Sequence, residues 1–102
     1  MISFFSAKEL AGRISERAKL RRVQMNITQS MLADRAGVSY GSVKRFEQSG
    51  EISLKHLLQI AIVLDAVDEF EALFRTSAYR SVREMVEQKK KKEKKRARRN
   101  DS

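Results

Sequence analysis

Apolar residues in the middle third of the chain recur at the spacing of two short amphipathic helices. Gly37 lies between the two segments, where its freedom to adopt a positive φ allows a helix to end sharply. Thr28 and Ser39 stand one position before each segment and are residue types that cap helix N-termini. The sequence therefore predicts helices over residues 29–36 and 40–48, joined by a three-residue turn. The apolar or small residues that face inward from the two helices and the turn are Leu32, Ala33, Ala36, Val38, Val43 and Phe46.

A longer helix is predicted before this pair. Ser6 and Glu9 form a capping-box pattern, in which Ser6 caps the helix and Glu9 reaches back to it. The helix then runs over residues 7–25, and Asn26 is suited to close it because asparagine tolerates the left-handed conformation. Its predicted inward-facing residues are Leu10, Ile14 and Ala18.

The second half of the chain continues the helical pattern, and nothing in it indicates a β-strand. Residues 54–64 are apolar nearly all round, so we expect this helix to be the buried centre of the domain. Shorter helices are predicted around residues 68–75 and 77–88, followed by a basic tail over residues 89–102. The fold class is therefore all-α, with a five-helix bundle over residues 1–76, a C-terminal helical extension and a disordered tail.

Five residues remain on the outer face of the segment 40–48: Tyr40, Gly41, Ser42, Lys44 and Arg45. They are donors or small residues on a short helix with a capped N-terminus. Such a helix suits the major groove of DNA, where base edges are read by side-chain donors and acceptors.

The whole pattern resembles the helix-turn-helix of lambda-repressor and Cro-like proteins, often called the XRE family. The matching residues are Thr28-Gln29, Leu32-Ala33, Ala36-Gly37-Val38-Ser39, Val43 and Phe46-Glu47. The resemblance extends over about residues 13–74. It implies a lambda-repressor-like bundle that binds double-stranded DNA sequence-specifically and regulates transcription, most simply as a repressor.

The same resemblance implies roles for individual residues. Gln29 is expected to bridge a phosphate and the start of the recognition helix, and Arg22 with Glu47 to form a structural ion pair. Arg45 is the strongest candidate for base reading, because a bidentate pair with guanine gives ~1–3 kcal/mol of discrimination. The alternative for Arg45 is a solvated position on the helix surface or a structural ion pair. The base-reading positions are Tyr40, Gly41, Ser42 and Arg45, and the phosphate-contacting positions are Asn26, Thr28, Gln29, Ser39 and Lys44.

One small domain reads few base pairs, and members of the family usually bind near-palindromic operators as dimers. Apolar residues beyond the central helices are the candidate homodimer interface: Phe70, Leu73, Phe74, Tyr79 and Val82. For Phe70 and Leu73, completion of the monomer core is an equally good interpretation.

The composition limits the kinds of chemical site that the chain can form. The chain has 102 residues, no cysteine and a single histidine, His56, so it offers neither disulfides nor thiolate metal ligands. No nucleophile–base pair or phosphate-binding glycine loop is apparent, so we expect no enzyme, no metal and no cofactor. No signal peptide or membrane-spanning run is apparent, and a cytoplasmic location is expected.

The net charge of +9 is unevenly distributed. Residues 1–88 carry 13 basic and 11 acidic residues, whereas residues 89–102 carry nine basic and two acidic residues. The tail leaves an alternative open, namely an RNA- or membrane-surface-binding module that uses the polybasic run. A further resemblance of residues 45–54 and 68–74 to proteins encoded beside Hip-type kinase toxins implies an antitoxin with a kinase-like toxin partner. Such an antitoxin either binds DNA as well or only neutralises the toxin.

Overall fold

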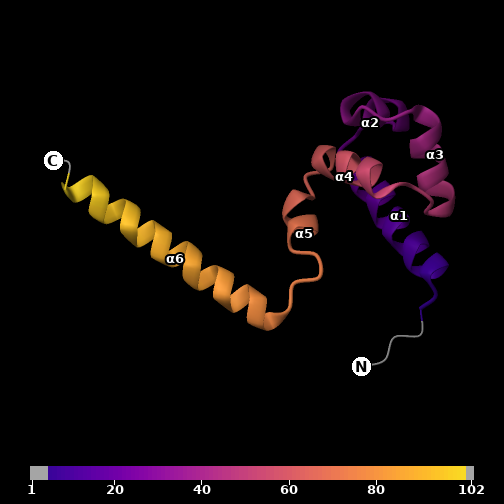
Figure 1. The fold of residues 1–102 in the computed structure, drawn as a ribbon. Helices are drawn as coiled ribbons and strands as arrows, with labels where there is room; N and C mark the ends of the chain where they lie inside the picture. The colour runs from indigo at the N-terminus through magenta and orange to yellow at the C-terminus, as the bar shows by residue number, and fades with distance from the viewer. Residues whose placement is uncertain (1–4, 101–102) are drawn as a thin grey trace. The chain divides into compact units, whose positions relative to one another are not determined.

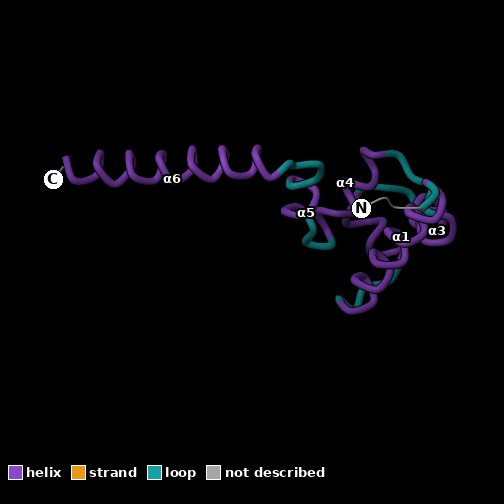
Figure 2. The backbone as a smooth tube through the Cα atoms, turned by 90° about the horizontal axis from the view of Figure 1, so that it is seen from below, coloured by secondary structure: helices purple, strands orange, loops and turns teal. Residues whose placement is uncertain are grey.

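The computed structural model describes the backbone of residues 5–100 and the side chains of residues 5–76 and 82–94. Within residues 5–100 the chain forms α-helices and no strand (Figures 1 and 2), which confirms the predicted all-α fold class. The helices are α1 (Ala7–Gln24), α2 (Gln29–Ala36), α3 (Tyr40–Ser49), α4 (Leu54–Val63), α5 (Val67–Glu71) and α6 (Ser77–Asn100). The chain divides into two compact units, Met1–Glu71 and Ala72–Ser102.

Helices α1 to α5 make up the first unit around one small core. α3 packs against both α1 and α2, while α4 packs against α2 on one side and α5 on the other. Val43, Leu32, Ile60 and Phe46 have at most 2% of their surface exposed and form the centre of this core. α2 and α3 are therefore held as a rigid pair by residues that face away from the outer surface of α3.

The starts of α2, α3 and α4 are fixed by local hydrogen bonds. The side-chain oxygens of Thr28, Ser39 and Ser53 each accept from the backbone N–H three residues later, at 3.1, 3.0 and 3.2 Å. Gly37 ends α2 with φ of 70°, in the left-handed region that favours glycine. These local signals are why the predicted boundaries of α2 and α3 agree with the structure to within one residue.

The buried side of α1 differs from the prediction. Leu10 and Ile14 were predicted to face inward, but they are 46% and 37% exposed. The side of α1 that faces α3 instead carries small and polar residues, including buried Ser15 and Arg22. The reason is the close approach of the chain after α3, since a Cβ on Gly50 would lie 2.8 Å from the carbonyl carbon of Ala11.

The start of α1 agrees with the prediction. Ser6 accepts from the N–H of Glu9 at 3.1 Å, as predicted for a cap. The carboxylate of Glu9 reaches back to Ser6, as predicted, and accepts from its hydroxyl at 3.2 Å. After the helix, Asn26 has φ of 59°, in the left-handed conformation that was predicted for it.

Two expectations about α4 and α5 are also corrected. α4 is not buried all round, because Leu54, Leu58 and Ile62 form an exposed face while Ile60 lies in the core. When a helix is apolar on every side, its sequence does not indicate which side will be covered by other helices. Here α2 and α5 cover only part of α4. α5 ends at Glu71, whereas the prediction placed its end near residue 75. Three residues after this end, the backbone of Phe74 adopts the left-handed conformation, with φ of 65°.

In the second unit, α6 continues through the basic run that was predicted to be disordered from residue 89. Lysine, arginine and alanine are good helix formers, so the absence of an apolar face does not by itself end a helix. An ion pair of 3.1 Å between Arg83 and Glu87, one turn apart, adds to the helix. No helix among the described residues is both long enough and apolar enough to cross a bilayer.

Candidate nucleic-acid interface

The outer face of α3 is the centre of the candidate site. Val43 and Phe46 face the core, so Tyr40, Lys44 and Arg45 lie on the solvent side of the same helix, with Tyr40 49% exposed. Lys44 Nζ lies 5.5 Å from the centroid of the Tyr40 ring, one turn away, in a cation–π arrangement. The helix thus presents a positive charge and an aromatic hydroxyl group side by side.

The first turn of α3 is tied to its cap. Ser39 Oγ accepts from the N–H of Ser42 and donates to Ser42 Oγ at 2.8 Å. Ser42 is half-buried, and its Oγ already accepts one hydrogen bond. Its own hydroxyl hydrogen is the group left for an external acceptor. Gly41 beside it is exposed and keeps the backbone of this turn accessible.

Arg45 forms an ion pair with Glu51, which matches the alternative interpretation of Arg45 although the partner itself was not predicted. Its Nε donates to Glu51 Oε2 at 2.8 Å, and its Nη2 donates to the same oxygen. Glu51 lies in the connection between α3 and α4, six residues after Arg45. The feature of the sequence that could have indicated this pair is Gly50, because its left-handed φ of 77° turns the chain back alongside α3.

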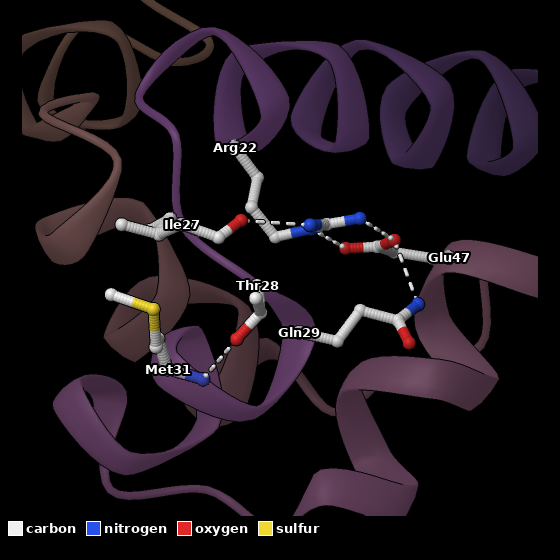
Figure 3. Close-up of polar contacts among 6 residues, drawn as sticks. All are labelled: Arg22, Ile27, Thr28, Gln29, Met31 and Glu47. Carbon is white, nitrogen blue, oxygen red and sulfur yellow. Dashed lines mark hydrogen bonds and ion pairs between the residues drawn. The ribbon is translucent and has the colours of Figure 1, made fainter.

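Behind this face, the side chains of Arg22 and Gln29 converge on the carboxylate of Glu47 (Figure 3). Arg22 Nε and Nη2 donate to the two oxygens of Glu47 at 2.8 and 3.0 Å, and Arg22 Nη1 donates to the carbonyl oxygen of Ile27 at 2.8 Å. Gln29 Nε2 donates to Glu47 Oε1 at 3.0 Å. The structure thus brings together Arg22 and Glu47, which the sequence paired, and joins the ends of α1 and α3 to the start of α2.

Gln29 makes a different contact from the one expected. It was predicted to bond the start of α3, but its amide donates to Glu47 in the last turn of that helix. The bond fixes the side chain at the N-terminus of α2, where Thr28 Oγ1 satisfies only the N–H of Met31 (Figure 3). The first amides of any α-helix have no carbonyl partner within the helix, and such a helix end suits an anion.

The predicted dimer residues occupy mixed environments. Phe70 is half-buried, whereas Leu73, Phe74 and Val82 are 53%, 93% and 61% exposed. The side chain of Tyr79 lies outside the described residues. Of the four residues whose side chains are described, Phe70 is the one partly buried within the monomer.

The described part of the chain holds no cluster of three histidine, cysteine, aspartate or glutamate side chains that would suit a metal ion. His56 lies in the first turn of α4, and its backbone N–H serves the Ser53 cap. His56 lines a shallow cavity of about 310 Å³ together with Arg45 and Glu51. The site therefore consists of hydrogen-bonding and charged groups arranged on an open surface.

Comparison with known proteins gives one family. A family model described as helix-turn-helix matches residues 18–71, from the second half of α1 to the end of α5. No curated protein matches the chain. The predicted link to Hip-type toxin–antitoxin pairs has no support from these comparisons and stays a prediction from the sequence.

Proposed function

Because the chain belongs to the XRE-type helix-turn-helix family of DNA-binding regulators, we propose that it is a transcriptional repressor that reads its operator with α3. The observation that carries this proposal is the outer face of α3, where Arg45, Lys44 and Tyr40 project from a helix whose opposite side is locked into the core. A rigid, capped helix with donors on its outer face fits the major groove.

Base reading is assigned to Arg45, Ser42 and Tyr40, with Gly41 allowing close approach. The guanidinium of Arg45 can donate two parallel hydrogen bonds to guanine O6 and N7. Ser42 offers one hydroxyl donor, and Tyr40 offers ring carbons to a thymine methyl group or its hydroxyl to a phosphate.

Phosphate contacts are assigned to the start of α2 and to the flank of α3. The amides at the N-terminus of α2 and the side chain of Gln29 meet one phosphate, because the helix end favours negative charge. Lys44, Ser39 and Asn26 contact the backbone nearby. The basic run of α6 adds attraction to any polyanion, and this attraction carries little sequence information.

A homodimer is the proposed assembly, because a single recognition helix covers too few base pairs to specify a site. Leu73, Phe74 and Val82 support it, since large apolar side chains with more than half of their surface exposed favour a protein partner. The two α3 helices of such a dimer would lie ~34 Å apart, one turn of B-DNA. Sedimentation at tens of micromolar and a footprint of two half-sites test this assembly.

The experiment that tests DNA reading starts by selecting an operator from a pool of random duplexes with the full chain. Arg45→Ala should then cost ~1–3 kcal/mol on the selected operator and relax the preference at one guanine. Arg45→Lys is the matched control. It keeps the charge but lacks the bidentate fork, so it should retain affinity for random DNA while losing the guanine preference. Unchanged base preference in both variants would reject Arg45 as a reader, and failure to select any sequence would reject the proposed function.

A further inference from the structure

The pair formed by Arg45 and Glu51 leaves a particular set of donors available. Both of its hydrogen bonds use the edge of the guanidinium formed by Nε and Nη2, and both end on Glu51 Oε2. The edge formed by Nη1 and the second Nη2 hydrogen is not used by Glu51. Two parallel donors on that edge are what the bidentate pair with guanine O6 and N7 requires.

The backbone around Glu51 is itself fixed. Ser49 Oγ donates to the carbonyl oxygen of Arg45 at 2.7 Å and accepts from the N–H of Glu51 at 3.3 Å. Gly50 between them adopts φ of 77° and packs against the backbone at Ala11. The carboxylate is therefore carried back to Arg45 by a turn that has little freedom to move.

This ion pair contributes little to folding. The side chains of Arg45 and Glu51 are 72% and 62% exposed, and ion pairs at such exposed positions add little to stability. A contact that costs two long side chains their freedom, yet does little for the fold, is better explained by what it does to the outward edge of Arg45.

We propose that Glu51 is a positioning residue that sets the specificity of DNA reading, by orienting the guanidinium of Arg45 toward a guanine and by repelling phosphates from the same place. This inference rests on the proposed function of α3. Because Glu51 already holds the Arg45 side chain in one orientation, less conformational entropy is lost when Arg45 binds a base. Repulsion weakens the alternative in which Arg45 binds the DNA backbone without reading sequence.

Glu51→Ala should therefore lower base discrimination while raising the affinity for random duplex. Discrimination between the selected operator and the same operator with its guanine replaced should fall by about 2- to 10-fold, which corresponds to the freedom of one ordered side chain. Affinity for random duplex should rise by about 2-fold at low salt, because one negative charge is removed near the backbone. A purely structural role of Glu51 would lower the affinity for the operator and the affinity for random duplex together.

Three further variants separate charge from orientation. Glu51→Gln keeps an acceptor of the same length and should lose less discrimination than Glu51→Ala. Glu16→Ala removes an exposed carboxylate of α1 and should leave the base preference unchanged. In the Arg45→Ala background, Glu51→Ala should not alter base preference at all. Melting temperatures of all variants should match that of the unmodified chain to within a few degrees.

The measurement is a titration of each variant against the two operators and a random duplex, with fluorescence anisotropy as the readout. Unchanged or increased discrimination in Glu51→Ala overturns the inference, and so does a lost preference at a cytosine, which would make Glu51 itself a base reader. The proposed function is tested by separate measurements. It fails if the unmodified chain selects no sequence, or if Arg45→Ala keeps the full base preference.

Discussion

Arg22 and Glu47 are joined by two hydrogen bonds across 25 positions of sequence, and this pair locks the end of α1 to the last turn of α3. Their side chains are only 10% and 4% exposed. Removing charges from water offsets much of the attraction within such a pair, so its main effect is on geometry. The angle at which α3 faces outward is therefore tied to α1, and the bond from Gln29 ties the start of α2 to the same carboxylate.

Truncation of Glu47 should be far more damaging than replacement of the whole pair. Glu47→Ala leaves the guanidinium of Arg22 buried without its carboxylate, and we expect a loss of about 3–5 kcal/mol in the free energy of unfolding. The double variant Arg22→Met with Glu47→Leu removes both charges and should recover a large part of that loss. Urea denaturation followed by circular dichroism measures both; equal losses in the single and the double variant would contradict the interpretation.

Gly50 and Gly12 should respond in opposite ways to alanine. At Gly50 a Cβ would lie 2.8–2.9 Å from atoms of Ala11, and φ is 77°. Gly50→Ala should therefore destabilise the fold by at least about 1–2 kcal/mol, the cost of the left-handed conformation alone. At Gly12, within α1, a Cβ meets no atom within 4 Å, and Gly12→Ala should stabilise by about 0.5–1 kcal/mol. Thermal unfolding of both variants checks the two signs.

The contact between Arg21 and Glu69 should make stability depend on pH. Hydrogen bonds from Arg21, at 2.6 and 2.9 Å, lower the pKa of Glu69 below its ordinary value, against a smaller opposing effect of desolvation. A carboxyl group with a lowered pKa in the folded state stabilises the fold above its unfolded pKa. That contribution is lost as the pH falls through the folded value.

The side chains of Arg21 and Glu69 are 39% and 59% exposed, so solvent screens the contact and its effect on stability is small. Glu69→Gln should therefore unfold at a slightly lower temperature than the unmodified chain at pH 7, and the difference should shrink as the pH falls below the ordinary glutamate range. Arg21→Gln should behave in the same way, because it removes the other half of the contact. The double variant should be no less stable than either single one. A difference in unfolding temperature that does not change with pH would count against this contact as the source.

Lys44 and Gln29 should be distinguishable by salt. Both are proposed to contact phosphates, so Lys44→Ala and Gln29→Ala should each weaken binding to operator and random DNA by similar factors. Lys44 releases a counterion when it binds, so its loss should reduce the slope of log K against log salt concentration by about 1. Gln29 is neutral and its loss should leave the slope unchanged. Equal slopes for the two variants would remove Lys44 from the phosphate contacts.

The sequence predicted those parts of the structure that depend on neighbouring residues. Thr28, Gly37 and Ser39 act on backbone groups within three or four positions of themselves, so the bounds of α2 and α3 are encoded locally. The ion pair of Arg22 with Glu47 came instead from matching a family pattern, which carries long-range information.

Features that depend on packing were missed. Nothing local distinguishes Leu10 and Ile14, which are exposed, from the small residues on the side of α1 that faces α3. Glu51 is an ordinary surface carboxylate until Gly50 turns the chain back toward Arg45. The helical basic run of α6 was missed for another reason, since helix propensity acts without an apolar face.

The hydroxyl caps of α2, α3 and α4 bear on the order of events in folding. Each cap closes over three residues, so each helix start forms without waiting for a distant partner. Helical segments form within about a microsecond, and domains rich in such local contacts fold in microseconds to milliseconds. The pair of Arg22 with Glu47 requires closure of a much longer loop. We therefore expect the recognition helix to form first and to acquire its final orientation in a later step.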